Sequence, residues 1–220
     1  MISINDLTKE NIYEIISNAN KIKETKIYPN LSKNNIKVIG IFFVEPSTRT
    51  MHSFESAIYR SNAKIIKYNK DTSSEKKGET LYDSVRTMSS YVDMLIVRHP
   101  QLSKTNELMF SKKNTNNLPI INAGNNHFEH PTQALLDIFT IFENITFHDY
   151  KVINLGLAGD LKYSRTIHSL IYIFNILELK VRYYFICNDQ FLIEDKHLCF
   201  LKEKNIEYSY HNNLIDVLPD

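Results

Sequence analysis

The sequence feature that most constrains the fold is the apolar run "VIGIFFV", residues 38–44. An uninterrupted apolar stretch of this length predicts a strand that is buried on both faces, which is typical of a parallel sheet covered by helices. The residues "MHSFESAIYR" follow it and place Met51, Phe54 and Ile58 at helical spacing. The polar stretch between the two, "EPSTRT", therefore falls where a buried strand turns into a helix.

Strand-like and helix-like segments alternate along the rest of the chain, after an N-terminal helix expected at about residues 5–23. Such alternation predicts an α/β protein in which helices cover both faces of a parallel sheet. The helix that begins at Pro131 ends before the polar stretch "NITFHDY", and a second alternation follows. We therefore predict two doubly wound parallel-sheet domains, at residues 1–130 and 149–220, joined by a connecting helix at 131–148.

The strands and helices of the two domains are expected as follows. After "VIGIFFV", the first domain has the strands "AKIIKY", "MLIVRHP" and "LPIINAG", a helix from Thr80 and a weaker helix at about 105–111. The second has the strands "KVINLGLAGD", "VRYYFI" and "IEYSY", with a final helix at about 189–204. A doubly wound domain normally has more strands than this, so we expect the second domain to be truncated at its C-terminus.

Composition argues against several kinds of partner. The formal net charge is +1 with both signs mixed along the chain, which argues against a nucleic-acid or membrane surface held by bulk electrostatics. Cys187 and Cys199 lack metal-ligand spacing and cannot form a disulfide framework, so a reducing, cytoplasmic location is expected. The N-terminus lacks a signal-peptide pattern, and no apolar run approaches membrane-spanning length.

His127 and His130 form an H-x-x-H pair without a third ligand nearby, so no metal site is expected.

Polar motifs recur at the carboxyl ends of the predicted strands, which is the edge where parallel sheets bind ligands. They are "EPSTRT", "RHP" at 98–100, "NAG" followed by "EHPTQ" at 129–133, and "GDLKYSRT" at 159–166. Each alone has an ordinary explanation as a helix cap, a strand-end charge or a surface arginine. Together on one edge they indicate a shared anion-binding site. By contrast, "SSEKKGET" at 73–80 has the composition of a solvated loop.

The "STRT" motif suits an anion for a physical reason. The first turn of a helix has backbone N–H groups without internal partners and lies at the positive end of the helix dipole. Ser47, Thr48 and Thr50 add hydroxyl donors, and Arg49 adds a planar guanidinium that fits phosphate or carboxylate. An ordinary serine or threonine cap beside a solvated arginine would give the same motif. Taken alone, the motif leaves both interpretations open.

Several stretches together resemble a known family. "FFVEPSTRT", "KKGET", "VRHP", "NAG" followed by "HPTQALLD", and "GDLKYSRT" with "HSL" are similar, in order and spacing, to aspartate carbamoyltransferase catalytic chains of the aspartate/ornithine carbamoyltransferase family. The resemblance is dense from about Phe42 to Leu170 and thinner toward both ends. "STRT" and "HPTQ" also occur in ornithine carbamoyltransferases, whereas "KKGET" and "GDLKYSRT" resemble the aspartate branch.

The resemblance implies transfer of the carbamoyl group from carbamoyl phosphate to the amine of L-aspartate, which gives N-carbamoyl-L-aspartate and phosphate in pyrimidine biosynthesis. It implies neither a metal ion nor an organic cofactor. The residues that match the family's carbamoyl phosphate site are Ser47, Thr48, Arg49, Thr50, Ser73, Arg98, His130 and Gln133. Among them, Thr50, Arg98 and His130 would act catalytically by polarising the carbonyl oxygen. Gln133 would lie near the carbamoyl nitrogen.

The resemblance also implies an aspartate site and an oligomer. Arg165 and Thr166 match part of the aspartate site, and Glu45 matches a residue that braces the two domains through Arg165. Lys77 is expected to be catalytic and to contact aspartate. In the family, the loop that contains Ser73 and Lys77 reaches a neighbouring subunit's site, so we expect a homotrimer with shared active sites. Some family members also assemble with a regulatory chain, and the sequence leaves open whether this chain has such a partner.

The C-terminal end departs from the family pattern. The family's second domain continues with an arginine- and glutamine-bearing loop that grips aspartate, and with a His-x-Leu-Pro loop beside the carbamoyl group. Neither precedes Asp220, where this chain ends. We expect the catalytic chain of a longer active polypeptide. The alternatives are a sibling carbamoyltransferase with another amine substrate, and a non-catalytic or remnant protein that keeps the trimer contacts and binds carbamoyl phosphate.

Overall fold

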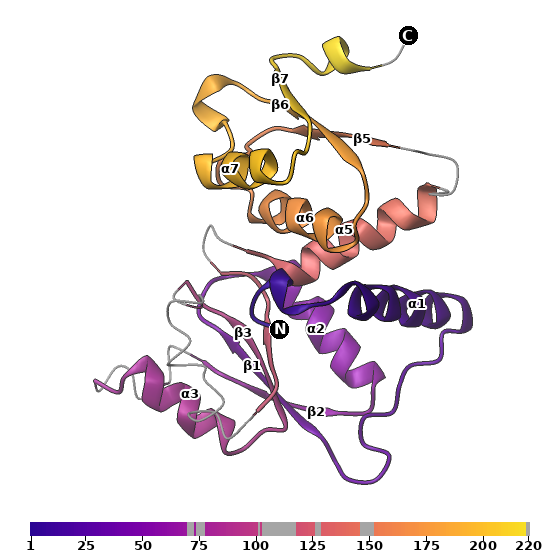
Figure 1. Cartoon of the computed structure of the whole chain (residues 1–220). Coiled ribbons are helices and arrows are strands. Elements are labelled where there is room, and N and C mark those ends of the chain that lie inside the picture. Colours follow the sequence, from indigo (N-terminus) through magenta and orange to yellow (C-terminus); the bar gives the residue numbers. More distant parts are fainter. Residues whose placement is uncertain are drawn as a thin grey trace.

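The computed structural model describes residues 1–69, 73, 78–100, 102, 118–125, 129–145 and 152–218. The chain forms an α/β structure with two separate parallel sheets and helices packed against them (Figure 1). This confirms the fold class predicted from the alternating segments. Among the described helices, none combines the length and the apolar character needed to cross a membrane.

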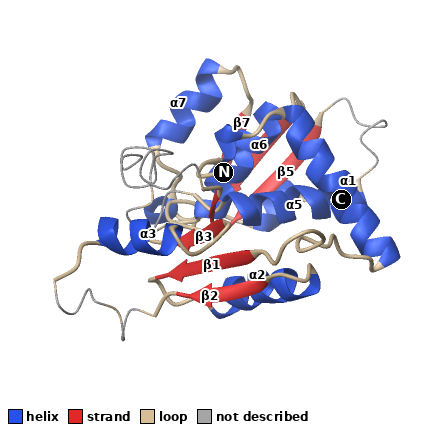
Figure 2. Ribbon diagram, turned by 90° about the horizontal axis from the view of Figure 1, so that it is seen from below, coloured by secondary structure: helices blue, strands red, loops and turns tan. Residues whose placement is uncertain are grey.

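The first sheet has the strand order β2-β1-β3-β4, and every pairing is parallel. Its strands are β1 (Val38–Phe43), β2 (Lys64–Lys67), β3 (Met94–Arg98) and β4 (Ile120–Asn122). Two connecting helices are α2 (Thr48–Arg60), after β1, and α3 (Leu81–Ser89), after β2. Figure 2 shows β1 and β2 side by side with α2 next to them. All four carboxyl ends therefore lie at the same edge of this sheet.

Strand β1 is buried on both faces, as its apolar run predicts. Ile41 belongs to a core that includes Ile58 of α2, whereas Phe42 belongs to a core that includes Val85 of α3. Successive side chains of a strand point to opposite faces, so both sets must be apolar. Gly40 makes room on the α3 face, because a Cβ added there would lie 2.7 Å from Leu95 Cδ1.

The second sheet has the order β5-β6-β7 and is also parallel. Its strands are β5 (Ile153–Ala158), β6 (Val181–Ile186) and β7 (Tyr208–His211), with the helices α6 (Arg165–Ile176) and α7 (Asp195–Glu203). Phe174 of α6, Phe185 of β6 and Leu201 of α7 are buried in one core. A short turn of 3-10 helix, η7 (Leu214–Val217), follows β7.

The helix predicted at about 189–204 is interrupted. The structure has a 3-10 turn, η6 (Asp189–Phe191), and then α7, with Leu192 in an extended conformation between them. Ile193 lies in the same break and is 3% exposed, within the core of the second sheet. The predicted helix is therefore broken at the position where the Ile193 side chain enters the core. The weak helix predicted at about 105–111 lies outside the described residues.

The N-terminal segment packs with the core of the second sheet. It forms a 3-10 turn, η1 (Ile4–Asp6), and α1 (Lys9–Thr25), where a single helix at about 5–23 was predicted. Ile12 and Ile16 of α1 share a core with Ile138 of α5 (Pro131–Asn144) and with α6 (Figure 1). The boundaries at 130 and 148 stay predictions, but this packing joins the N-terminal helix to elements of the predicted second domain.

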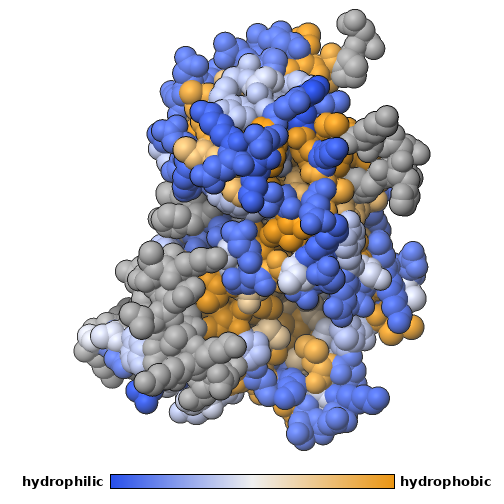
Figure 3. All heavy atoms as spheres, viewed as in Figure 1, coloured by the Kyte–Doolittle hydropathy of each residue, from blue (hydrophilic) through white to orange (hydrophobic). Residues whose placement is uncertain are grey.

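On the face shown in Figure 3, hydrophilic residues cover much of the described surface. Apolar residues show mainly in the middle, between the parts of the molecule that contain the two sheets. Most large apolar side chains are used in the three cores, as expected for a chain of mixed surface charge.

Candidate active site

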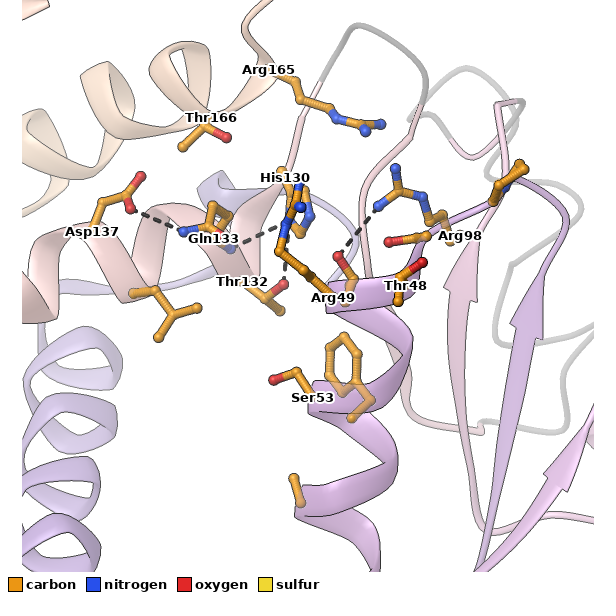
Figure 4. A pocket seen from close by; sticks show the side chains of 16 residues that line it. Thr48, Arg49, Ser53, Arg98, His130, Thr132, Gln133, Asp137, Arg165 and Thr166 are labelled. Carbon is orange, nitrogen blue, oxygen red and sulfur yellow. Dashed lines mark hydrogen bonds between the residues drawn. The ribbon is translucent and has the colours of Figure 1, made fainter.

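A cavity of about 940 Å³ lies at the carboxyl ends of β1 and β3. Three helices, α2, α5 and α6, begin beside it and contribute residues of their first turns to its lining (Figure 4). Because a helix N-terminus has unpaired N–H groups and a positive dipole end, this convergence favours an anion. The predicted site residues that line the cavity are Ser47, Thr48, Arg49, Thr50, Arg98, His130, Gln133, Arg165 and Thr166.

Ser73 is not among the described residues that line this cavity. Ser73 is described, and its Oγ accepts a hydrogen bond from the Tyr68 hydroxyl at 3.1 Å. Lys77 lies outside the described residues. The resemblance implied that both residues serve a neighbouring subunit's site, and that assignment stays a prediction.

The N-terminus of α2 is open toward the cavity. Ser47 is its N-cap and has an extended backbone, but its side chain makes no capping hydrogen bond within the described part of the chain. Thr80 behaves differently, because its Oγ1 caps α3 by accepting the Asp83 N–H at 3.2 Å. The first turn of α2, which is fully described, contains no acidic residue. Ser47 is thus not an ordinary cap, and its hydroxyl and the first-turn N–H groups can meet an anion.

Arg98 is a buried cation at the end of β3. The residue is 7% exposed, and its Nη1 donates to the Ala123 carbonyl at 3.3 Å and to Thr50 Oγ1 at 3.5 Å. Burial, and then repulsion from Arg165, lowers the pKa of the Arg98 guanidinium, while Glu45 acts in the opposite direction. The group still remains protonated at neutral pH. An anion in the cavity would therefore offset a positive charge that the protein compensates only in part.

Glu45 connects the two sides of the cavity. Its Oε2 lies 3.5 Å from Arg98 Nε and 3.6 Å from Arg165 Nη1. Glu45 follows β1, whereas Arg165 is the first residue of α6, so the pair joins the first sheet to a helix of the second. The structure thus contains the pair between Glu45 and Arg165 that the resemblance implied. Both distances exceed those of short charge-assisted hydrogen bonds, and the buried Arg98 Nε has no hydrogen-bond partner among the described residues.

The N-cap of α5 holds the His130 imidazole in one tautomer. Its Nδ1 accepts the Gln133 backbone N–H at 3.3 Å, so the ring proton belongs on Nε2 (Figure 4). Burial, followed by repulsion from Arg165 and Arg98, lowers the pKa of His130 to about 4. At neutral pH the ring is therefore uncharged, and its Nε2–H is a hydrogen-bond donor. Such a group can polarise a carbonyl oxygen, but it is a poor general base.

Gly124 lets His130 and Arg98 approach each other. Its φ of +104° is in the region that favours glycine. A Cβ built on it would lie 3.0 Å from His130 Cδ2 and 3.4 Å from Arg98 Nη1. The glycine of the "NAG" motif is therefore required both for its backbone conformation and for the packing of two site residues.

The sequence reasoning missed several residues that line the cavity, including Ser53 and Asp137. Asp137 Oδ1 accepts a hydrogen bond from Gln133 Nε2 at 3.0 Å. Ser53 follows Arg49 by four residues on α2, and Asp137 follows Gln133 by four residues on α5. That spacing places both on the same helix face as a recognised residue, so a search one turn beyond each motif would have found them.

The described residues contain no cluster of histidine, cysteine, aspartate and glutamate side chains that could hold a metal ion. His127, the other member of the H-x-x-H pair, lies outside them. The functional groups of the described lining are mainly arginines and hydroxyls, with one amide, a neutral imidazole and the Asp137 carboxylate. The preponderance of hydrogen-bond donors suits recognition of anions and carbonyl groups.

Comparison with known proteins points to one family. Residues 1–143 match the sequence profile described as aspartate/ornithine carbamoyltransferase, carbamoyl-P binding domain. The chain is 41% identical over 220 residues to the aspartate carbamoyltransferase catalytic subunit of Wigglesworthia glossinidia brevipalpis. That match covers 99% of this chain and 68% of the relative.

Solved structures agree with the sequence matches. The catalytic subunit of M. jannaschii aspartate transcarbamoylase matches with a TM-score of 0.82 at 36% identity, over 99% of this chain and 70% of that chain. Aspartate transcarbamoylase from Trypanosoma cruzi, in complex with N-(phosphonacetyl)-L-aspartic acid, matches with a TM-score of 0.80 at 29% identity, over 97% of this chain and 66% of that chain. By its motifs, its fold and these similarities, the chain belongs to the aspartate/ornithine carbamoyltransferase family.

Proposed function

We propose that this chain is an aspartate carbamoyltransferase catalytic chain, which transfers the carbamoyl group from carbamoyl phosphate to L-aspartate. The observation that supports this most strongly is the cavity where the N-termini of α2, α5 and α6 converge with three arginines and a neutral histidine. The substrates fit this chemistry, because they carry a phosphate, two carboxylates and a carbonyl oxygen that becomes negative during the reaction. The reaction would supply an early intermediate of pyrimidine biosynthesis.

The phosphate would bind at the N-terminus of α2. Ser47, Thr48 and Thr50 would donate their hydroxyls, the first-turn N–H groups would point at the phosphate oxygens, and Arg49 would provide a charged fork. The uncapped state of Ser47 and the absence of an acidic residue in the fully described first turn support this assignment.

The carbonyl oxygen would lie against Arg98, His130 and Thr50. When the amine of aspartate attacks the carbonyl carbon, the C=O electrons move to oxygen, and donors already in place stabilise the oxyanion. The C=O bond then re-forms as the C–O bond to phosphate breaks, and the leaving phosphate would take the proton that the amine loses. His130 would act by its Nε2–H donor, because its pKa near 4 keeps the ring neutral.

Aspartate would enter from the α6 side. Arg165 and Thr166 lie at the N-terminus of α6 and line the cavity, so a carboxylate could meet a guanidinium and a helix dipole together. The loose pair between Arg165 and Glu45 supports this role, since a carboxylate could replace it without breaking a tight contact.

We further propose a cytoplasmic homotrimer in which Ser73 and Lys77 complete a neighbour's active site. The position of Ser73 outside the cavity of its own chain supports this arrangement. Mixing an inactive Lys77→Ala protein with an inactive Arg49→Ala protein should restore some activity, because hybrid trimers would contain sites with neither change. No recovery after demonstrated subunit exchange would count against shared sites.

The main proposal is tested first by calorimetry with carbamoyl phosphate and then by carbamoyl-aspartate formation. Arg49→Ala should weaken binding at least about tenfold, because a charge-assisted contact to the phosphate is lost. Arg60→Ala is the matched control, since Arg60 lies at the far end of α2 and donates to Tyr28 OH at 3.1 Å. It should bind like the unchanged chain.

The outcomes separate the candidate functions. Binding with turnover of aspartate supports the proposed enzyme, and turnover of another amine in competition supports a sibling carbamoyltransferase. Binding without turnover of any amine supports a non-catalytic carbamoyl phosphate protein. A chain that does not bind carbamoyl phosphate would overturn the proposal.

A further inference from the structure

The amide of Gln133 is held in one orientation by a neighbour on its own helix. Gln133 and Asp137 lie one turn apart on α5, and Gln133 Nε2 donates to Asp137 Oδ1 at 3.0 Å (Figure 4). A carboxylate can only accept, and the amide nitrogen is the only donor that a glutamine side chain offers. The bond therefore fixes the nitrogen on the Asp137 side and turns the carbonyl oxygen, Oε1, away from it.

This orientation matters because the other side chains of the cavity are mainly donors. The guanidinium groups of Arg49, Arg98 and Arg165 can only donate. His130 offers its Nε2–H, because its Nδ1 already accepts the Gln133 backbone N–H. Apart from hydroxyls, the acceptors among the described side chains of the lining are therefore the Asp137 carboxylate and the Gln133 Oε1.

Carbamoyl phosphate, the substrate of the proposed function on which this inference rests, has one group that needs an acceptor. Its phosphate and carbonyl oxygens accept hydrogen bonds, whereas its amino group donates them. In a cavity of donors, an acceptor at one position would define where the amino group lies and hence which way the carbonyl oxygen faces.

We propose that Asp137 is a positioning residue that holds Gln133 with Oε1 available to the substrate, so that the site selects the carbamoyl amino group over an isosteric methyl group. Asp137 acts through Gln133, and no contact between Asp137 and the substrate is required. The half-buried position of Asp137 strengthens the effect, because fewer water molecules compete for the Gln133 amide.

The test compares binding of carbamoyl phosphate with binding of acetyl phosphate, which has a methyl group in place of the amino group. Asp137→Asn removes the carboxylate but keeps its shape, and its amide can pair with either end of Gln133. The affinity ratio between the two ligands should fall about five- to tenfold, as expected when one hydrogen bond is no longer held in place. The loss should come from carbamoyl phosphate, with acetyl phosphate changed by less than about twofold.

Four further proteins make the result specific: Asp137→Ala, Gln133→Ala, the double variant Gln133→Ala/Asp137→Asn, and a control. Asp137→Ala removes the acceptor altogether and must also lower the ratio. In a Gln133→Ala background, Asp137→Asn must leave the ratio unchanged, because the residue through which it acts is gone. Glu143→Gln is the matched control, since Glu143 is another acid of α5 but pairs with Lys23 on the surface and is not among the residues that line the cavity.

The outcomes are decisive in both directions. An unchanged ratio, an equal loss for both ligands, or a further fall in the Gln133→Ala background would overturn the inference and leave the proposed function standing. If the unchanged chain does not bind carbamoyl phosphate, the proposed function fails and the inference fails with it.

Discussion

Helices α2 and α6 both begin at the cavity, yet they contribute to it unequally. The first turn of α2 brings Thr48, Arg49 and Thr50 to the cavity, next to its N-cap serine, whereas α6 brings Arg165 and Thr166. The cation beside α2, Arg98, has a side chain that is 9% exposed, against 23% for Arg165. A single strand-to-helix turn thus supplies three lining residues in a row beside an N-cap serine, whereas the α6 turn supplies two, of which Arg165 is paired with Glu45 across the cavity.

The largest expected difference between the two sides is in binding of carbamoyl phosphate. Arg98→Ala should weaken binding roughly 10- to 100-fold, because it removes a buried charged donor from the carbonyl position. Arg165→Ala should change the same affinity by less than about twofold, although it should slow turnover with aspartate. Calorimetry on the two variants measures both effects. Equal losses of affinity would show that the cavity acts as one undivided cationic site.

The two sides can also be compared by the backbone conformation of one glycine on each. Gly124 and Gly159 both have positive φ, of +104° and +111°, so alanine at either position should cost about 1–3 kcal/mol of unfolding free energy. Only Gly124 has site residues against it, whereas a Cβ on Gly159 would meet nothing within 4 Å among the described residues. Gly124→Ala should therefore also weaken carbamoyl phosphate binding, and Gly159→Ala should not.

Denaturant unfolding and calorimetry measure these two effects separately. If both variants lose stability but neither loses affinity, then the close contact of Gly124 with His130 and Arg98 does not hold the site in shape. If Gly159→Ala weakens binding as strongly as Gly124→Ala, then carbamoyl phosphate binding does not depend more on the α2 side of the cavity than on the α6 side.

Buried histidines on both sides should make the fold sensitive to acid. Burial is the main cause that lowers the pKa of His130 to about 4 and of His197, a buried residue of α7, to about 3. The ordinary pKa is 6.5, so below that pH the unfolded chain binds more protons than the folded chain, and the free energy of unfolding falls. The loss is up to about 1.4 kcal/mol per pH unit for each histidine, until the pH reaches its folded pKa.

His197→Leu tests the acid effect away from the cavity. The variant should be less stable at pH 7, because the Tyr172 hydroxyl loses its partner at 3.1 Å, His197 Nδ1. Its unfolding free energy should nevertheless change less steeply between about pH 6.5 and 4.5, since one titrating group is gone. His130→Asn should flatten the same slope and also weaken carbamoyl phosphate binding. An unchanged slope in both variants would show that neither histidine causes the acid sensitivity.

Sequence reasoning succeeded best where the pattern is local, as at the start of α2. Ser47 to Thr50 are contiguous, and an apolar strand before them and a helical pattern after them define their geometry. The role of β1 between two helical layers was predicted for the same reason. Local patterns with fixed periods determine such features, so no tertiary information is needed.

What the sequence did not reveal depends on contacts between distant or unmarked residues. The hydrogen bond from Gln133 to Asp137 is local, but aspartate on a helix is ordinarily a surface residue, so only its position one turn beyond Gln133 marked it. The packing of α1 against α5 joins segments more than a hundred residues apart, which periodicity cannot predict. The interruption before α7 depends on the burial of Ile193 in a core formed by other elements.

The smallest expected effects concern the two serines that begin α2 and α6. Ser47 and Ser164 are N-caps whose side chains make no capping hydrogen bond within the described residues. Replacing an ordinary capping residue by alanine costs about 1 kcal/mol, which is the loss expected for Thr80→Ala, since Thr80 does cap α3. Ser47→Ala and Ser164→Ala should each cost less than about 0.5 kcal/mol of unfolding free energy, because no capping bond is lost.

The two serines should differ in ligand binding. Ser47 lines the cavity and should donate to the phosphate, so Ser47→Ala should weaken carbamoyl phosphate binding about three- to tenfold, whereas Ser164 is not among the described lining residues and its variant should bind normally. Denaturation and calorimetry on Ser47→Ala, Ser164→Ala and Thr80→Ala give three distinct expected patterns. A stability loss for Ser47→Ala as large as that for Thr80→Ala would mean that Ser47 is an ordinary cap after all, and the α2 turn would then be less open to an anion than its geometry implies.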